Sequence, residues 1–152
     1  MRFLFILLIL FVASDSYAEN ICGFVHISKE SNDGIIINFK GMHRIKVNHN
    51  VNGWAVSKSG KWFVVYGLPI HIERQFPQTT YLSVYKNIKE PKIMKTQSFG
   101  GGIFEVKFDN KEKNIFVSEQ RGIYKMNTNT LKIKNIGINV DLESEIYSGA
   151  CN

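Results

Sequence analysis

Short apolar runs alternate with polar turns along most of this chain, and the pattern predicts an all-β protein. The runs consist mainly of Ile, Val, Phe and Tyr, side chains that suit a pleated, half-buried surface. Each run ends at Gly, Asn, Asp, Ser or Pro, residues that favour turns. The predicted strands are Cys22–Ile27, Gly34–Phe39, Arg44–Val47, Gly53–Val56, Lys61–Tyr66, Ile70–Glu73, Thr80–Lys86, Lys92–Thr96, Ile103–Phe108, Asn114–Ser118, Gly122–Met126 and Lys132–Ile136.

The close spacing of these strands indicates antiparallel sheets, because hairpins need only short turns. Turn sequences such as Ser31–Gly34 and Asp109–Asn114 agree with hairpin connections. A helix is considered only at Val140–Tyr147, where acidic residues suit the first turn but Leu142 and Ile146 alone make a thin apolar face.

Three segments share one order of elements: a strand, a polar turn, an apolar strand, a turn containing glycine and a further strand. These segments are Val25–Val47, Trp54–Ile72 and Val106–Met126. The third continues through an Asn-Thr-Asn-Thr turn to Ile133, and there it resembles a blade of the YVTN/WD40-like β-propeller families. Known propellers have about four to eight blades, and this chain has room for about three. We therefore expect antiparallel meander repeats in a small propeller-like or sandwich-like domain.

The N-terminus follows the three-part pattern of a secretory signal peptide. Arg2 supplies a positive charge, Phe3–Ala13 is an unbroken apolar run, and the small residues Ser16 and Ala18 occupy positions −3 and −1 of the predicted cleavage site. As a helix this run spans about 16 Å, whereas a hydrocarbon core of about 30 Å needs roughly 20 residues. We expect cleavage after Ala18 and one domain over 19–152, with no stable membrane insertion afterwards. An uncleaved anchor is the alternative.

The two cysteines, Cys22 and Cys151, lie near the two ends of the mature chain. Export to an oxidising compartment makes one disulfide between them the expected arrangement, so the ends of the domain would be joined. Two unpaired buried thiols are the alternative. A catalytic cysteine is not supported, because neither residue lies in a Cys-x-x-Cys motif or beside a histidine.

The chain carries 19 basic and 13 acidic residues, which gives a formal net charge of +6. The predicted leader holds one of each, Arg2 and Asp15, so the mature chain keeps the same surplus. A positive surplus favours an acidic partner, such as an acidic protein face, an anionic glycan or lipid headgroups. A nucleic-acid partner is not expected, because the lysines are scattered along the sequence and export separates the chain from most nucleic acid.

No catalytic group, metal site or cofactor site emerges from the residue spacings. The four histidines are His26, His43, His49 and His71. They show neither the His-x-His nor the His-x-x-x-His spacing of a zinc site. No serine lies in a Gly-x-Ser-x-Gly motif, and the triple glycine lacks the Lys-Ser or Lys-Thr of a phosphate-binding loop. Among the carboxylates, Glu105 and Glu119 are the pair expected to face one region, as an acid and a base would require.

Two segments have the composition of exposed binding loops. The first, Gln97-Ser98-Phe99-Gly100-Gly101-Gly102, is expected to protrude, with Phe99 as its apolar tip and the glycines allowing close backbone approach. The second contains Arg74, Phe76 and Tyr81, residue types that are enriched at interface hot spots. The alternatives are a flexible connection for the first segment and aromatic rings packed back on the sheet for the second.

A short leader, a compact β domain and one bond joining its ends resemble the layout of periplasmic immunity proteins that neutralise antibacterial toxins. Those of type VI secretion amidase and muramidase effectors are the nearest match, and inhibitors of host lysozyme look similar. The resemblance implies a non-enzymatic protein, periplasmic or secreted, that inserts a loop into the active-site cleft of a cell-wall-degrading toxin. The alternatives are a glycan-binding or structural envelope module and, after these, a cell-wall hydrolase.

We predict that the mature protein begins at Glu19 and contains no free thiol. N-terminal sequencing checks the first point, and a thiol reagent applied to the denatured protein checks the second. Replacing Cys151 by serine should lower the free energy of unfolding by about 4 kcal/mol, because the long loop is no longer closed in the unfolded state. Cys22→Ser should lower the free energy of unfolding by the same amount, and the double variant should lower it no further, because one bond is lost in each case. Two reactive thiols in the denatured protein would contradict the disulfide.

Overall fold

The structure is a computed structural model that describes residues 24–72, 74–75 and 77–138. Its strands are β1 (His26–Ser31), β2 (Gly34–Asn38), β3 (Met42–Lys46), β4 (Gly53–Val56), β5 (Trp62–Gly67), β6 (Thr80–Lys86), β7 (Lys92–Phe99), β8 (Ile103–Phe108), β9 (Asn114–Glu119), β10 (Gly122–Asn127) and β11 (Ile133–Gly137). Every neighbouring pair is antiparallel. The all-β prediction is confirmed. The leader, both cysteines and the helix considered at Val140–Tyr147 lie outside the described residues.

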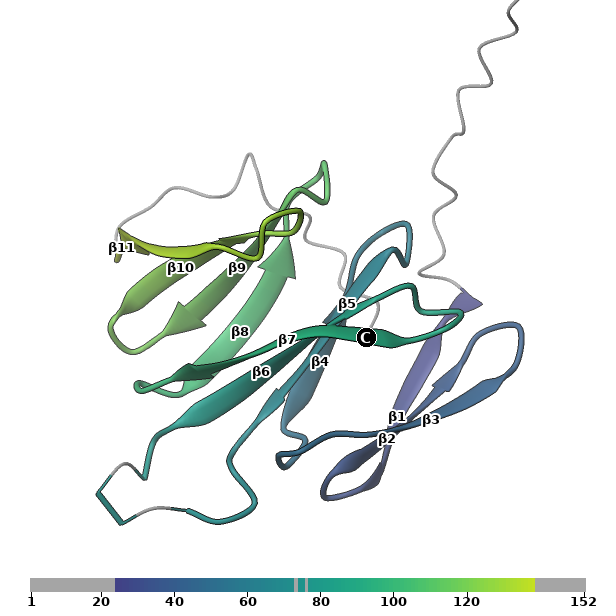
Figure 1. Cartoon of the computed structure of the whole chain (residues 1–152), viewed down its shortest axis with the longest axis horizontal. Coiled ribbons are helices and arrows are strands. Elements are labelled where there is room, and N and C mark those ends of the chain that lie inside the picture. Colours follow the sequence, from purple (N-terminus) through teal and green to yellow (C-terminus); the bar gives the residue numbers. More distant parts are fainter. Residues whose placement is uncertain (1–23, 73, 76, 139–152) are drawn as a thin grey trace, which may run out of the picture.

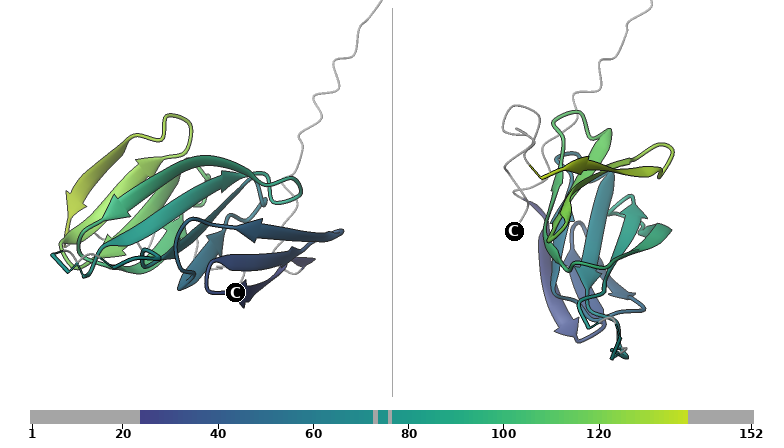
Figure 2. Two further views of the ribbon diagram at one scale, coloured as in Figure 1. Left: turned by 60° about the horizontal axis from the view of Figure 1, so that its bottom comes forward. Right: turned by 90° about the vertical axis from the view of Figure 1, so that its left-hand side faces the viewer.

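The strands form three sheets, each from consecutive elements (Figure 1): β1-β2-β3, β4-β5-β6-β7 and β8-β9-β10-β11. The predicted repeats correspond to these meanders. Val25–Val47 forms the first sheet, Trp54–Ile72 supplies β4 and β5, and Val106–Met126 contains most of the third sheet. The sheets stack one after another (Figures 1 and 2), and the described part of the chain does not close into a propeller.

The middle sheet is buried on both faces, and β5 shows this most clearly. Phe63 and Val65 belong to the hydrophobic cluster shared with the first sheet, whereas Trp62 and Val64 belong to the cluster shared with the third. Successive side chains of a strand point to opposite faces, so a strand buried on both must be apolar at every position. This explains the unbroken run from Trp62 to Tyr66.

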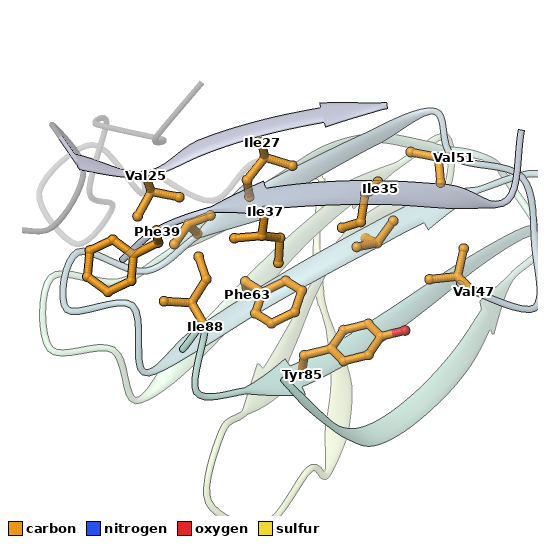
Figure 3. Close-up of a cluster of buried hydrophobic side chains, with 12 residues drawn as sticks. Val25, Ile27, Ile35, Ile37, Phe39, Val47, Val51, Phe63, Tyr85 and Ile88 are labelled. Carbon is orange, nitrogen blue, oxygen red and sulfur yellow. The ribbon is translucent and has the colours of Figure 1, made fainter. Parts of the chain in front are cut away.

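The first cluster fills the space between the first and second sheets (Figure 3). Ile35 and Ile37 of β2 approach the middle sheet, where the rings of Phe63 and Tyr85 stack with centroids 4.7 Å apart. The second cluster lies between the second and third sheets. Its fully buried members are Val64, Leu82, Val84, Ile115, Val117 and Met126.

The outer faces of the stack are polar. On the first sheet, Ser28 and Arg44 flank Ile36 in one cross-strand row. On the third, Lys125 lies opposite Lys134, and its ammonium group lies 5.4 Å from the centroid of the Phe116 ring. Ile36 and Met42 are apolar exceptions on the first sheet, so these faces offer no continuous apolar surface to a further sheet, much as the polar outer face of a terminal repeat ends a repeat array.

The strand connections gather at two opposite edges of the stack, because each meander reverses direction at every strand (Figure 1). One edge, which we call the loop edge, carries residues 32–33, 47–52, 68–79, 100–102 and 120–121. The other, the turn edge, carries 39–41, 57–61, 109–113, 128–132 and 86–92, the last of which includes the final residue of β6 and the first of β7. Both crossings from one sheet to the next, 47–52 and 100–102, lie at the loop edge, whereas every connection at the turn edge is a hairpin within one sheet.

We predict large and comparable losses of stability from truncations in the two clusters. Phe63→Ala should cost about 3–5 kcal/mol and Ile115→Ala about 2–5 kcal/mol, since each leaves a cavity in a closed core. Ile72→Ala, at a side chain that is 55% exposed, is the control and should change stability by less than about 0.5 kcal/mol. Urea denaturation measures all three. A Phe63→Ala protein as stable as the parent would show that the two-sided burial of β5 is wrong.

Candidate functional site

The triple glycine forms the crossing from the second sheet to the third. β7 ends at Phe99 and β8 begins at Ile103, so three residues span the step. The N–H of Gly101 donates a 2.7 Å hydrogen bond to Oε2 of Glu119. A Cβ on Gly101 would lie only 2.7 Å from the same oxygen, and Gly102 has a φ of +77°. This close approach and the left-handed backbone require glycine here.

The prediction that Phe99 is the tip of a protruding loop is wrong. Gln97, Ser98 and Phe99 belong to β7, and the Phe99 side chain is only 5% exposed. Its ring meets the Tyr124 ring edge to face, with the centroids 5.4 Å apart. An apolar residue before a run of glycines can end a buried strand as well as tip a loop, and here it closes the core at the end of the sheet.

A shallow pocket of about 330 Å³ lies beside this crossing at the loop edge. It is lined by Gln78, Gly101, Gly102, Phe104 and Gln120, and the lining is mainly apolar. The Phe104 side chain is 68% exposed. On the neighbouring turn the guanidinium of Arg121 lies against the crossing, with Nη1 3.5 Å from the Cβ position of Gly100. An exposed ring and a cation therefore flank the pocket.

Sequence alternation does not reveal that Phe104 is exposed. Because alternate side chains of a strand point to the same face, Phe104 would be expected to share a face with Val106 and Phe108, both of which are buried. A β-bulge between Ile103 and Glu105 shifts the register against β9 and turns Phe104 outward. A bulge of this kind has no clear signal in a single sequence.

The segment 68–79 is an exposed loop, and the strand predicted at Ile70–Glu73 is wrong. Proline cannot donate to a strand ladder, and within the described part of this loop strand pairing is limited to the isolated bridge between His49 and Pro69. Asn50 holds the base of the loop, donating from its backbone N–H to Leu68 O at 2.7 Å and from Nδ2 to Pro69 O at 3.0 Å. Beyond this base Ile70 and Ile72 are 51% and 55% exposed.

The two segments predicted as binding loops do lie side by side, but not all of their residues are exposed. β6 pairs with β7 so that Tyr81 lies opposite Ser98. The Tyr81 ring stacks on His49 at 6.2 Å and is half-buried. Arg74 and Gly100 are exposed, and Phe76 lies outside the described residues. We define the loop-edge surface as Ile70, Ile72, Arg74, Phe104 and Arg121 together with the pocket.

Glu105 and Glu119 do not face one region, contrary to the prediction. Glu105 pairs with Ser118 across the strands, so Glu119, the next residue of β9, points to the opposite face of the sheet. Glu119 is buried against Gly101, whereas Glu105 is exposed and forms a 2.9 Å ion pair with Lys107. The pair therefore lacks the arrangement of an acid and a base that share one substrate.

A buried polar network joins the first crossing to the middle sheet. His49 Nε2 lies 2.9 Å from Ser83 Oγ, and Nδ1 lies 2.8 Å from the carbonyl oxygen of Asn50. A carbonyl only accepts, so Nδ1 carries the proton and Nε2 accepts from the Ser83 hydroxyl. This order resembles an oriented base beside a nucleophile. Both side chains are 0% exposed, however, so the network holds the backbone of 47–52 rather than facing a substrate.

Sequence reasoning missed this network because its members are far apart in the chain. His49 and Ser83 are separated by 34 residues, and neither belongs to a motif. Burial lowers the pKa of His49 below its ordinary value, and the hydrogen bond to Asn50 opposes that shift. The neutral imidazole is therefore the form that belongs to the folded protein.

Comparison with known proteins adds no identity: no protein-family model matches the chain, and no curated protein matches it. Within residues 24–72, 74–75 and 77–138, no group of three His, Cys, Asp or Glu residues could hold a metal ion. The same part of the chain contains no helix long and apolar enough to cross a membrane. The geometry of the loop edge is therefore the basis for a functional proposal.

We predict that the folded protein loses stability as the pH falls below about 6.5, because His49 is protonated more readily in the unfolded chain. The contribution of neutral His49 is complete above that pH and declines as the pH approaches the lowered pKa of the folded state. Urea denaturation between about pH 5 and about pH 8 measures how the free energy of unfolding changes with pH. His49→Gln should be less stable at neutral pH and should show a flatter slope, while His43→Gln serves as control. An unchanged slope in His49→Gln would contradict the assignment.

Proposed function

We propose that this chain is an exported binding protein that neutralises a cell-wall-degrading toxin, and that the loop-edge surface is its contact surface. One observation carries the proposal: three exposed apolar side chains and two exposed arginines lie at the loop edge of the stack. Ile70, Ile72 and Phe104 are each more than half exposed. Aromatic and arginine side chains with fixed surroundings are the usual anchors of protein interfaces.

The loop-edge surface is pre-organised, which favours tight binding. Glu119 fixes the crossing at Gly101, and Asn50 fixes the base of loop 68–79 with two hydrogen bonds. A surface that is ordered before binding loses less conformational entropy when a partner docks. Loop 68–79, not the short glycine turn, is the element that projects from this edge (Figure 1).

The charge of the loop-edge surface suits the cleft of a wall-degrading enzyme. Arg74 and Arg121 are exposed there, while the carboxylate of Glu119 is buried and bonded to Gly101. Most glycoside hydrolases carry a pair of carboxylates beside the scissile bond. A guanidinium is the side chain that best matches carboxylate geometry. This complementarity supports a muramidase-type toxin as the partner.

The layout features predicted from sequence belong to the same proposal. We infer a periplasmic or secreted location, a Cys22–Cys151 bond that joins the ends of the domain, and three meanders related to propeller blades. The protein acts by occlusion and needs no cofactor.

A glycan-binding module is the second candidate, and the pocket favours it. Two amide side chains, Gln78 and Gln120, line the pocket with the exposed Phe104 ring. Because the pocket lining is mainly apolar, the exposed ring rather than the amides would be the main contact with a sugar. The two candidates differ in their target, which is a folded toxin in one case and a wall fragment in the other.

The test uses the gene immediately upstream of the gene for this chain, and we expect that upstream gene to encode the toxin. Its product is directed to the periplasm of a Gram-negative host, and lysis is followed with and without the full chain. We expect the full chain to prevent lysis and a chain lacking residues 1–18 not to. In titration with the purified toxin, the double variant Phe104→Asp, Arg121→Glu should bind at least ~100-fold more weakly, because two anchors are lost. The matched control is Met42→Asp, Arg44→Glu, which alters an exposed apolar residue and an arginine on the outer face of the first sheet.

Full protection by Phe104→Asp, Arg121→Glu would show that the loop-edge surface is wrong. Failure of the parent chain to protect would overturn the inhibitor proposal. If the purified chain then bound peptidoglycan fragments, and replacing Phe104 abolished that binding, a glycan-binding module would replace the inhibitor as the proposed function. Cleavage of those fragments by the chain would establish a hydrolase instead.

A further inference from the structure

Exposed lysines gather on the turn edge, although the same lysines look scattered in the sequence. Every one of the five turns at this edge contributes at least one, and each is exposed. Arginine is absent from these turns. The lysines are Lys40, Lys58, Lys61, Lys86, Lys89, Lys92, Lys111, Lys113 and Lys132.

The carboxylates of the turn edge are mostly engaged in holding the turns. Asp109 accepts hydrogen bonds from the backbone N–H groups of Lys113 at 2.7 Å and Asn114 at 3.1 Å. Glu112 accepts from the backbone N–H and the hydroxyl of Ser59 in the neighbouring sheet. Glu90 is the remaining acid in these turns. Nine lysines against three acids leave a surplus of six positive charges at this edge.

A repeated turn geometry produces this arrangement. Each turn contains a residue of left-handed backbone: Lys40 (φ 49°), Gly60 (67°), Asn87 (61°), Glu112 (53°) and Leu131 (54°), and in the first turn Gly41 (144°) also has a positive φ. In three of the turns a lysine follows this residue directly. Three-residue hairpin loops commonly end with a residue of left-handed backbone, which forms a bulge where the next strand begins. The lysines therefore recur at equivalent places in successive meanders.

The chemistry of the edge favours a diffuse anionic surface over a specific anion. Lysine carries a compact, strongly hydrated charge on a flexible stem, whereas arginine provides the planar fork used for bidentate recognition. The rings at this edge are covered: Phe39 and Trp62 are 3% and 4% exposed, and the ammonium groups of Lys89 and Lys86 lie over them at 5.8 and 5.9 Å. The exposed apolar side chains at this edge are few: Phe24, Met42 and Ile93 lie beside the turns rather than in them. Against nine lysines, charge is the main attraction that this edge offers.

We propose that the turn edge docks the protein electrostatically on a membrane surface rich in anionic lipid headgroups. Lysines near such a surface each strengthen binding about fivefold, and several acting together hold a protein there reversibly. The loop edge lies at the opposite side of the stack and faces away from the membrane. This inference does not rest on the inhibitor proposal, because it uses a different edge and a different partner.

The test measures co-sedimentation of the mature chain with vesicles. Vesicles of phosphatidylglycerol mixed with phosphatidylcholine should bind the protein, and vesicles of phosphatidylcholine alone should not. Binding should disappear near 1 M salt, where the screening length falls to about 3 Å. Lys61→Gln, Lys92→Gln, Lys111→Gln removes one lysine from each of three turns and should weaken binding roughly 100-fold.

The matched control removes three lysines elsewhere, as Lys46→Gln, Lys125→Gln, Lys134→Gln, and has the same net charge. It should weaken binding less than about tenfold, and thermal melting confirms that both triple variants are folded. Equal losses in the two variants would show that net charge, not the turn edge, governs binding. No binding to the mixed vesicles would overturn the proposal. Tighter binding of a soluble anionic polysaccharide through the same three lysines would replace the membrane by a glycan.

Discussion

The burial of β5 on both faces is the constraint on which the rest of the stack depends. The first sheet has most of its apolar side chains on one face, and so does the third. Each covers this face against the middle sheet, where Phe63 points one way and Val64 the other. A sheet with one apolar face is not stable alone in water. The outer sheets therefore fold as layers on a common centre, and their polar outer faces end the stack.

This constraint explains which features could be predicted from sequence. Strands that pack on a common core must be apolar on their buried face and must end at turns, as the run around Phe63 does. This pattern is visible in the sequence, and all eleven strands overlap their predicted ranges. Features that depend on register or on distant partners had no local signal. The bulge before Glu105 exposes Phe104, and packing against Tyr124 buries Phe99. The hydrogen bond between His49 and Ser83 joins residues that are separated in the sequence by β4 and β5. Composition identified loop 68–79 as a candidate contact, although it also suggested a strand there.

The loop edge combines crossings and long connections, and this combination explains its chemistry. A crossing must leave one sheet and enter another, so it needs special backbone and internal hydrogen bonds in place of strand pairing. The glycines at 100–102 with Glu119, and residues 47–52 with His49 and Asn50, meet that need. Polar groups that hold such crossings are buried and cannot act on a partner. Binding at this edge is therefore left to the residues around the crossings, which are Phe104, Arg121 and loop 68–79.

The turn edge has the opposite character for the same topological reason. All its connections are hairpins within one sheet, and their backbone groups bond within a turn or to the adjacent turn, so most side chains there can be charged. A meander with alternating connection types thus places Arg74, Arg121 and the exposed Phe104 at one edge and nine exposed lysines at the other. Positive charge is denser at the turn edge than over the rest of the described residues, so the charge of the molecule has a direction. An anionic surface would orient this protein, and that orientation presents the loop edge to a partner in solution.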